Sequence, residues 1–491
     1  MTATARPPTT ARPEDEKLPF PQLLGYGVQH ILSMFGGVIA VPIIIGGVAG
    51  LEPSQTALLV SCALFVSGLA TVLQTIGVPY LGSQLPLVQG ISFASVSTMV
   101  TIILGESSGE RGLRVVFGAV IVAAVVGLVV APFFSQVVRL FPPIVTGSVI
   151  TVIGISLMPV AAGWITGQPE LGGEPNPAYL DRGNLALALV TLALVLVMTK
   201  TPFLSRLAIL LGLVVGTIIA LVAGKASVDG VGDASVVALP TPFEFGTPIF
   251  EVGAIVAMTV VIVVIMVETT ADILAVGEVV GTTVDSRRVA DGVRADMISS
   301  AVAPVFNSFP ATAFAQNVGL VALTGVRSRF VVATGGAVLA VLGLSPVLAA
   351  VVGVIPIPVL GGAGIVLFGT VAASGIRTLG SVDYSNNNNM VVVAAAVAAG
   401  LLPIANEEFW SRMPDWFQTI FGSEISAAAI VAFTLNLFFN VFLPGSPPEP
   451  TDVAAGPPVM VREDEAEVLS EGGSFEAGRP APQTSPPPEE E

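Results

Sequence analysis

Charged residues are scarce in this chain. Only 11 % of its 491 residues are Asp, Glu, Lys or Arg, whereas an average soluble protein carries about 25 %. Hydrophobic residues make up 53 %, and apolar runs of about 20 residues, long enough to cross a hydrocarbon core, recur along the chain. Too little polar surface remains to solvate a globule of this size. The composition therefore argues against a string of soluble domains and predicts one polytopic protein embedded in a lipid bilayer.

Cysteine and histidine are almost absent. Cys62 is the single cysteine and His30 the single histidine. One cysteine excludes a disulfide framework or a cysteine metal cluster within the chain, and one histidine excludes a histidine-rich metal site. Cys62 lies in an apolar run and is expected to be a small buried residue. We predict no metal and no cofactor. The lack of a nucleophile paired with a base also argues against an intramembrane enzyme.

The net charge of −16 comes largely from one end of the sequence. Residues 446–491 hold 11 acidic and 2 basic residues and are rich in Pro, Gly and Ser. Such a composition cannot bury a core, so we expect a disordered acidic tail. Residues 1–19 are also polar and Pro-rich and are expected to be disordered. No basic tail is present to suggest a nucleic-acid partner.

Residues 20–445 form one predicted transmembrane domain of about 14 spans. Their approximate positions are 24–46, 55–76, 84–104, 113–131, 143–166, 184–200, 206–224, 250–276, 290–306, 310–325, 329–353, 357–378, 389–404 and 424–443. With the N-terminus inside, the inner loops hold more Lys and Arg than the outer loops. The positive-inside rule then places both termini in the cytoplasm, and we expect the protein in the inner (cell) membrane.

Two of these spans are interrupted by Pro and Gly. They read SQLPLVQGISFAS at residues 83–95 and SFPATAFAQNVGL at residues 308–320. Each begins with a Pro-containing stretch, Leu85–Val88 or Pro310–Ala315, and then reaches a glutamine. Aligning Gln89 with Gln316 puts one of them in each half of the chain. Interrupted segments at corresponding positions of two halves mark the binding site of many transporters. We expect the two stretches to pair as short antiparallel strands, with two half-helix N-termini aimed at the midplane. The alternative is a pair of ordinary Pro-kinked helices.

Carboxylates occur inside two of the apolar segments, where ionisable side chains are costly and usually functional. Glu268 and Asp272 are four residues apart and share one helix face. That pair suits a proton carrier or an acceptor for substrate N–H groups. Alternatively, the helix ends there and both carboxylates reach water. Asp296 lies in the next span or at its start, and its alternative role is an interfacial pair with Arg294.

Two further polar pairs lie in apolar segments. Gln316 and Asn317 offer amide donors and acceptors that match the alternating edge of a purine dione, although Asn317 could instead cap a helix. Gln29 and His30 lie in the first span. A lone histidine in a membrane helix is as often a packed contact residue as a functional one.

At these residues the sequence resembles the nucleobase-ascorbate transporter family, also called nucleobase:cation symporter-2. The family signature Gln/Glu/Pro-Asn-x-Gly-x4-Thr-Arg/Lys/Gly is matched by Gln316-Asn317-Val318-Gly319 and Thr324-Gly325. The Gln29-His30 pair, the Glu268 and Asp272 helix, Asp296, and the stretch from Gln89 to Phe93 follow in the family's order. Gln316 and Gly325 resemble the bacterial xanthine or uric acid permease type, since uracil carriers tend to have Glu at the position of Gln316. Val318 departs from the Asn of many purine members and leaves the exact purine open.

The resemblance implies an all-α fold with a 7+7 inverted repeat and two short strands in spans 3 and 10. It implies a core domain, about residues 20–131 and 250–353, a gate domain, about residues 135–224 and 357–443, and a homodimer. The implied activity is proton-coupled uptake of xanthine or uric acid. An alternative is a symporter of uracil or another nucleobase. A second alternative is an anion transporter of the same fold, although the site of such a transporter should lack the Glu268 carboxylate.

The resemblance also implies roles for individual residues. Glu268 and Gln316 would hold the base by hydrogen bonds, and Phe93 would stack on its ring. Ser92 and Ala315 would lend backbone groups, with Asn317 also in the substrate site. The residues that would shape the site and couple it to protons are Gln29, His30, Asp272 and Asp296.

Overall fold

The computed structural model describes residues 12–134, 140–167, 170–171, 174–176, 179–201, 204–228, 237–384, 387–406 and 408–442. Within these residues nine helices are long and apolar enough to cross a membrane. A tenth span results if two helices bent by 82° are taken as one, Arg329–Gly343 and Pro346–Gly353. The mostly helical membrane fold is therefore confirmed. Every predicted span contains helical structure, and spans 84–104 and 310–325 also contain a short strand, while the number of crossings remains a prediction.

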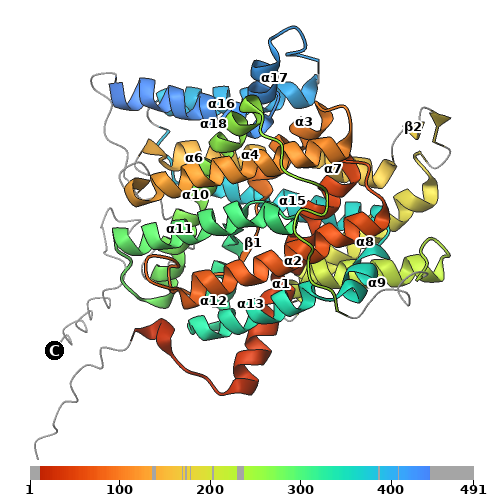
Figure 1. Ribbon diagram of the computed structural model, residues 1–491, viewed down its shortest axis with the longest axis horizontal. Coiled ribbons are helices and arrows are strands. Elements are labelled where there is room, and N and C mark those ends of the chain that lie inside the picture. Colours follow the sequence, from red (N-terminus) through yellow and green to blue (C-terminus); the bar gives the residue numbers. More distant parts are fainter. Residues whose placement is uncertain are drawn as a thin grey trace, which may run out of the picture. The chain divides into compact units, whose positions relative to one another are not determined.

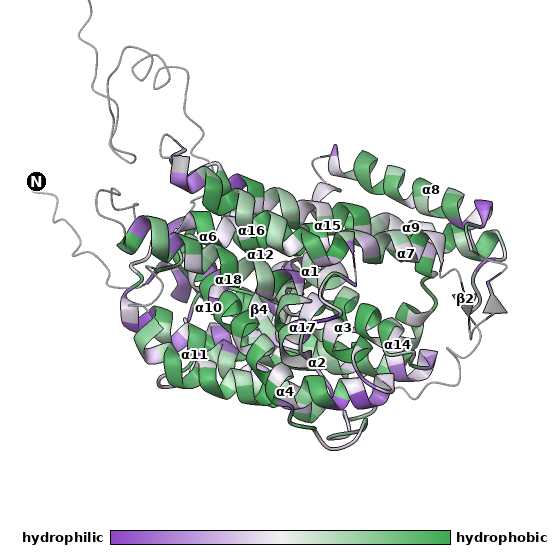
Figure 2. Cartoon of the chain, turned by 90° about the horizontal axis from the view of Figure 1, so that it is seen from above, coloured by the Kyte–Doolittle hydropathy of each residue, from purple (hydrophilic) through white to green (hydrophobic). Residues whose placement is uncertain are grey.

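The helices carry apolar side chains over most of their length, and the hydrophilic residues gather mainly near helix ends (Figure 2). The interior is a continuous apolar core, to which large side chains such as Phe117, Phe309 and Phe368 contribute. Cys62 is buried, as predicted. An apolar interior combined with an apolar exterior is the pattern of a protein whose solvent is lipid.

By their contacts, most helices belong to one of two groups, and Figure 1 shows the course of the chain through them. The first bundle consists of α1 (Phe20–Val48), α2 (Pro53–Ile76), α3 (Val96–Leu104), α4 (Gly109–Val130), α10 (Val252–Val280), α11 (Ser286–Val302), α12 (Ala315–Thr324), α13 (Arg329–Gly343) and α14 (Pro346–Gly353). In it α13 packs along α2 and α1, and α10 packs along α4 and α11. Helix starts are set by local capping: Glu52 and Gln55 form a capping box at α2, and Asp285 accepts the Arg288 N–H at α11.

The second bundle consists of α6 (Pro143–Ser156), α7 (Met158–Thr166), α8 (Arg182–Thr199), α9 (Ala208–Val222), α15 (Ile357–Leu379), α16 (Asn387–Ala405) and α18 (Glu424–Asn436). Here α15 packs against α6, α7, α8 and α9, and α16 packs against α18 and α6. Between the bundles, α1 meets α9 and the 3-10 turn η5 (Ser205–Leu207), while α10 and α3 meet α17 (Asp415–Phe421) and α18.

Glycines allow α2 and α13 to approach closely. A Cβ added to Gly68 would lie 2.3 Å from the Ala340 nitrogen, and one added to Gly343 would lie 2.3 Å from the Phe65 nitrogen. Any side chain at these positions would push the two backbones apart. Small residues at such contacts are the usual means by which helices associate in a membrane, where lipid provides no hydrophobic driving force between them.

Part of the N-terminal region departs from the disorder expected for residues 1–19. Pro13–Asp15 forms a 3-10 turn, and Glu14 is buried against Arg288, with Nη2 and Oε1 2.5 Å apart. The next residue, Asp15, pairs with Arg329 at 2.7 Å. Composition alone did not reveal these two arginine partners, which lie far along the chain. Residues 1–11 and the predicted acidic tail, 446–491, lie outside the described residues.

Three short elements were not predicted. Helix α17 lies between α16 and α18, and β2 (Glu170–Leu171) pairs antiparallel with β3 (Glu174–Pro175) between α7 and α8. All three fall in loops, where the apolar periodicity used to locate spans gives no signal.

Candidate functional site

Two strands meet inside the first bundle. β1 (Gln89–Ile91) pairs antiparallel with β4 (Ala311–Ala313), with Gln89 opposite Ala313 and Ile91 opposite Ala311. The ladder continues through the Ser92 N–H to the Pro310 carbonyl at 2.8 Å and the Phe314 N–H to the Val88 carbonyl at 3.1 Å. The predicted antiparallel pair is therefore confirmed. Each strand leads into a short helical run, through η2 (Phe93–Ser95) to α3 in one case and directly into α12 in the other.

The strands do not begin where the sequence suggested. Gln89 belongs to β1 itself instead of following the extended stretch, whereas Gln316 lies in the first turn of α12. The two glutamines are therefore not equivalent, and their predicted alignment is wrong. The prediction failed because each segment has a glutamine after a proline, which makes the two look alike in sequence. In the structure, however, Gln89 lies within its strand and Gln316 lies beyond its strand.

Each strand is held at its first residue by one hydroxyl. The Thr71 Oγ1 accepts the Gln89 N–H at 2.9 Å, and its proton points towards the Ser67 carbonyl at 2.8 Å and the Gln89 carbonyl at 3.2 Å. The Ser300 Oγ accepts the Ala311 N–H at 3.0 Å and donates towards the Ala311 carbonyl at 3.3 Å. Since Thr71 lies on α2 and Ser300 on α11, these matching clamps make Gln89 the structural counterpart of Ala311.

Three carboxyl groups lie beside β4. Glu268 and Asp272 are in the body of α10, which continues to Val280, so the reading of a helix end is wrong. Glu268 is half-buried, and the Thr312 hydroxyl donates to its Oε2 at 3.5 Å. Asp272 and Asp296 are buried, and one oxygen of each has no hydrogen-bond partner among the described residues.

Thr269 ties this carboxylate cluster to the strand. Its hydroxyl donates to the Asp296 Oδ2 and accepts the Ala313 N–H at 3.4 Å. Arg294 pairs with Asp291, so the alternative of an Arg294–Asp296 pair is also wrong. Residues two apart on a helix do not face each other, whereas residues three apart do. Asp296 is thus turned inward, towards α10 and β4.

His30 and Asn317 are hydrogen-bonded to each other although they are far apart in sequence. The His30 Nδ1 lies 2.7 Å from the Asn317 Oδ1, and the Asn317 Nδ2 donates to the Pro86 carbonyl at 2.6 Å. Because the amide nitrogen is used in this way, the amide oxygen must accept, and Nδ1 is assigned the imidazole proton. His30 therefore joins α1 to the start of α12. Its Nε2 has no partner among the described residues, and the adjacent Gln29 is half-buried.

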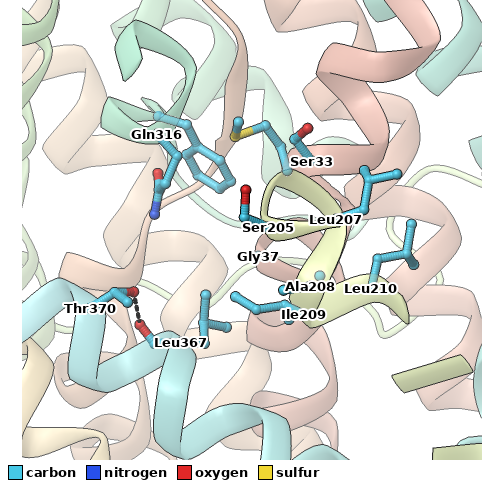
Figure 3. A pocket seen from close by; sticks show the side chains of 13 residues that line it. Ser33, Gly37, Ser205, Leu207, Ala208, Ile209, Leu210, Gln316, Leu367 and Thr370 are labelled. Carbon is cyan, nitrogen blue, oxygen red and sulfur yellow. Dashed lines mark hydrogen bonds between the residues drawn. The ribbon is translucent and has the colours of Figure 1, made fainter. Parts of the chain in front are cut away.

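A cavity of about 80 Å³ lies between the two bundles (Figure 3). From the first bundle it is lined by Ser33 on α1, and by Phe314 and Gln316 at the start of α12. From the second bundle it is lined by Thr370 on α15 and by residues of η5 and α9. Gln316 is exposed, and in Figure 3 its amide extends into the space on the side of Thr370.

The Phe314 ring lines this cavity, and further aromatic rings pack behind it. Phe93 stacks on Phe314 with ring centroids 6.4 Å apart and planes 23° apart, and it meets Phe368 of α15 edge-on at 6.0 Å. Phe93 itself is buried, so Phe314 is the ring that lines the space. Phe314 was not singled out from the sequence, although it stands two residues before Gln316.

The remaining predicted residues divide between the cavity rim and the interior. Ala315 is exposed beside Gln316. Ser92 is buried, and its N–H and carbonyl are engaged by Pro310 and Ser95. The structure therefore brings Gln316 and Phe314 together at the cavity, with Phe93 packed behind Phe314, and it gathers Glu268, Asp272 and Asp296 near β4. Thr269, Thr312 and Thr370 were missed because a threonine in an apolar helix or strand carries no distinctive pattern.

Known proteins match this chain over most of its length. The profile of the Permease family matches residues 21–409. The uric acid transporter UacT of Escherichia coli (strain K12) is 38 % identical over 85 % of this chain and 86 % of its own. A xanthine permease of Bacillus subtilis (strain 168) is 37 % identical over 86 % of this chain and 95 % of its own.

Solved structures show the same fold at low identity. The transmembrane domain of the cyanobacterium bicarbonate transporter BicA covers 86 % of this chain and 100 % of its own, with a TM-score of 0.56 and 15 % identity. The murine Slc26a9 anion transporter in the inward-facing state covers 86 % and 69 %, with a TM-score of 0.60 and 15 % identity. From the extent of the sequence matches, the chain belongs to this Permease family, which is the nucleobase-ascorbate transporter family of its motifs, and within it to the bacterial xanthine and uric acid permease type.

Proposed function

We propose that this protein is a secondary transporter that takes up a purine nucleobase, xanthine or uric acid, together with protons. The observation that carries the proposal is the exposed Gln316 amide at the first turn of α12, in a cavity between two helix bundles. A half-helix that begins inside a membrane domain presents a polar terminus where substrate is normally held. The named activities of the uric acid and xanthine permeases that resemble the chain support the same substrate class.

Recognition of the base rests on groups with complementary chemistry. The Gln316 amide carries a donor and an acceptor, as does each N–H and C=O pair on the edge of a purine dione. Phe314 supplies a ring face for stacking, with Phe93 stacked behind it, and Glu268 supplies a carboxylate for N–H groups. Ala315 is exposed next to Gln316, whereas Asn317 supports the site through His30.

Proton coupling rests on the carboxylate cluster. Glu268, Asp272 and Asp296 lie together within membrane helices, where ionised groups lose solvation and repel one another. Binding a proton at one of them relieves that repulsion and lowers the negative charge of the cluster. Protonation therefore favours the binding of a purine anion. We propose that Glu268, which is half-buried and nearest β4 by its Thr312 contact, gains and loses the coupled proton.

We propose that the first bundle is the core domain and the second bundle the gate domain expected from the family resemblance. The matching Thr71 and Ser300 clamps support a 7+7 inverted repeat, because they place spans 3 and 10 in equivalent settings. We further propose a homodimer in the inner membrane with both termini in the cytoplasm. The likeness to anion transporters extends to the fold alone, and a carboxylate such as Glu268 would repel a small anion.

Uptake by cells that lack their own purine permeases tests this function. We expect labelled xanthine or uric acid, but not uracil, to accumulate, and a protonophore to abolish accumulation. Glu268→Gln should abolish uphill uptake, while Glu278→Gln, an exposed position on the same helix, should leave it unchanged. Full accumulation by Glu268→Gln would disprove its role in coupling. No uptake of any of the three bases by protein present in the membrane would disprove the function.

A further inference from the structure

Two residues that carry hydroxyl groups line the cavity from opposite bundles. Ser33 lies on α1 of the first bundle and Thr370 on α15 of the second, and both line the space (Figure 3). The rest of the lining is largely apolar, with Met34, Leu207, Ile209 and Leu367 among its members, although Ser205 of η5 also borders it. In such surroundings each polar atom has a strong effect on which ligand can bind, because an unmatched polar group loses its hydrogen bond to water.

The local geometry fixes the hydrogen-bonding sense of both hydroxyls. The Ser33 Oγ donates to the Gln29 carbonyl at 2.8 Å, and the Thr370 Oγ1 donates to the Leu367 carbonyl at 2.6 Å. A hydroxyl has one proton and two lone pairs. Since both protons are directed at the backbone of their own helices, each oxygen can only accept a hydrogen bond from a molecule in the cavity.

We propose that Ser33 and Thr370 determine specificity by accepting hydrogen bonds from N–H groups of the substrate. This inference rests on the proposed function and extends the recognition set beyond Gln316. A purine dione carries N–H groups on both of its fused rings, and can donate to one acceptor on each bundle. Uracil carries both of its N–H groups on a single ring. The pair therefore favours a bicyclic, N–H-rich base, and Thr370 completes the site from the second bundle.

A purely structural role for the same hydroxyls must be separated from this one. Ser and Thr in membrane helices often bond to a carbonyl of the preceding turn without contacting a ligand. Thr378, about two turns further along α15, does the same with the Ser374 carbonyl at 3.1 Å. It does not line the cavity and therefore serves as a matched control on the same helix.

The test measures uptake and competition with variants of full-length protein. Thr370→Val keeps the shape of the side chain and removes the acceptor, and it should raise the KM for xanthine about tenfold, the effect of losing one buried hydrogen bond. Ser33→Ala should act in the same direction. Thr370→Ser retains the hydroxyl and should restore the wild-type KM, whereas Thr378→Val should leave the KM unchanged. Membrane abundance and melting temperature of each variant are measured in parallel.

Methylated xanthines identify the substrate N–H group that donates to the Thr370 hydroxyl. Xanthines methylated at N1, N3 or N7 each lack one N–H, and we expect one of them to compete equally weakly against wild type and Thr370→Val. Such non-additivity shows that the hydroxyl and that N–H interact. If all three analogues lose affinity independently of Thr370, or if Thr370→Val keeps the wild-type KM, the inference is overturned while purine uptake by wild type stands. Absence of purine uptake by wild type would overturn both.

Discussion

The two interrupted segments of the first bundle are built alike but meet the second bundle differently. Both begin with a three-residue strand held by a hydroxyl clamp, and both continue as a short helix. In the first segment, Thr98 on α3 lies against the second bundle, with its Oγ1 2.6 Å from the Oγ of Ser423, the residue that caps α18. In the second segment, Gln316 at the start of α12 faces a cavity.

Under the proposed inverted repeat, this difference indicates how two related segments give an asymmetric state. Thr98, Ser423 and Ser426 are all buried, so α3 and α18 are closely packed at this point. On the predicted topology this contact lies towards the outer side, and η5, which borders the cavity, lies towards the inner side. We infer that transport exchanges the two arrangements, separating α3 from α18 while closing the space beside α12.

Linking α3 to α18 covalently should have the largest effect. The double variant Thr98→Cys, Ser423→Cys places two thiols where the hydroxyls now touch, and Cys62, the single native cysteine, is buried. Oxidation, or addition of Hg²⁺ as a bridge between the thiols, should abolish uptake because the contact between α3 and α18 can no longer open. A reductant or a competing thiol should restore it. Initial uptake rates before and after treatment measure the effect.

Each single cysteine variant is the control, since neither can form the bridge. Both should transport with or without treatment. Cross-linked protein that still transports at the untreated rate would contradict separation of α3 from α18 during the cycle.

A glycine in each segment provides the second comparison. A Cβ added to Gly90 of β1 would lie 2.4 Å from the Cζ of Phe314, whereas a Cβ added to Gly319 of α12 meets nothing within 4 Å. Gly90→Ala should therefore displace the Phe314 ring that lines the cavity. The ratio of maximal uptake rate to KM for the purine should fall about tenfold, as overpacking of about 1–3 kcal/mol implies. Gly319→Ala should change neither the KM nor the maximal rate.

Uptake kinetics of both variants in parallel check this expectation. Equal losses would show that α12 tolerates no added side-chain volume and that Phe314 is not the cause. Normal uptake by Gly90→Ala would show that the Phe314 ring can move without cost to binding.

The sequence predicted the strand pair because Pro and Gly interrupt two otherwise apolar spans, a local signal. It could not predict the register, because the two clamping hydroxyls, Thr71 and Ser300, are ordinary residues within their helices. His30 and Asn317 were both identified, but their contact across 287 positions depends on how α1 and α12 pack. The Asp291–Arg294 pair, by contrast, follows from helical spacing and could have been preferred over Arg294 with Asp296.

Removing the clamps should have the smallest effect on transport and a measurable one on stability. Thr71→Val and Ser300→Ala each leave a buried strand N–H without its acceptor, at a cost of about 1–3 kcal/mol. Thr75→Val is the control, because the Thr75 hydroxyl bonds only to carbonyls of its own helix. Melting of the purified protein in detergent should show similar losses for the two clamp variants, a smaller loss for Thr75→Val, and recovery with Thr71→Ser.

The two stability losses decide whether the strands β1 and β4 contribute equally to the stability of the fold, although only the segment of β4 borders the cavity. Similar losses mean that the asymmetry arises beyond the strands, where α3 meets α18 and α12 meets the cavity. A large loss from Ser300→Ala alone would instead place the asymmetry in the strands, because β4 also anchors the carboxylate cluster through Thr269 and Thr312. In that case the β4 side would be the support on which both substrate and proton sites depend.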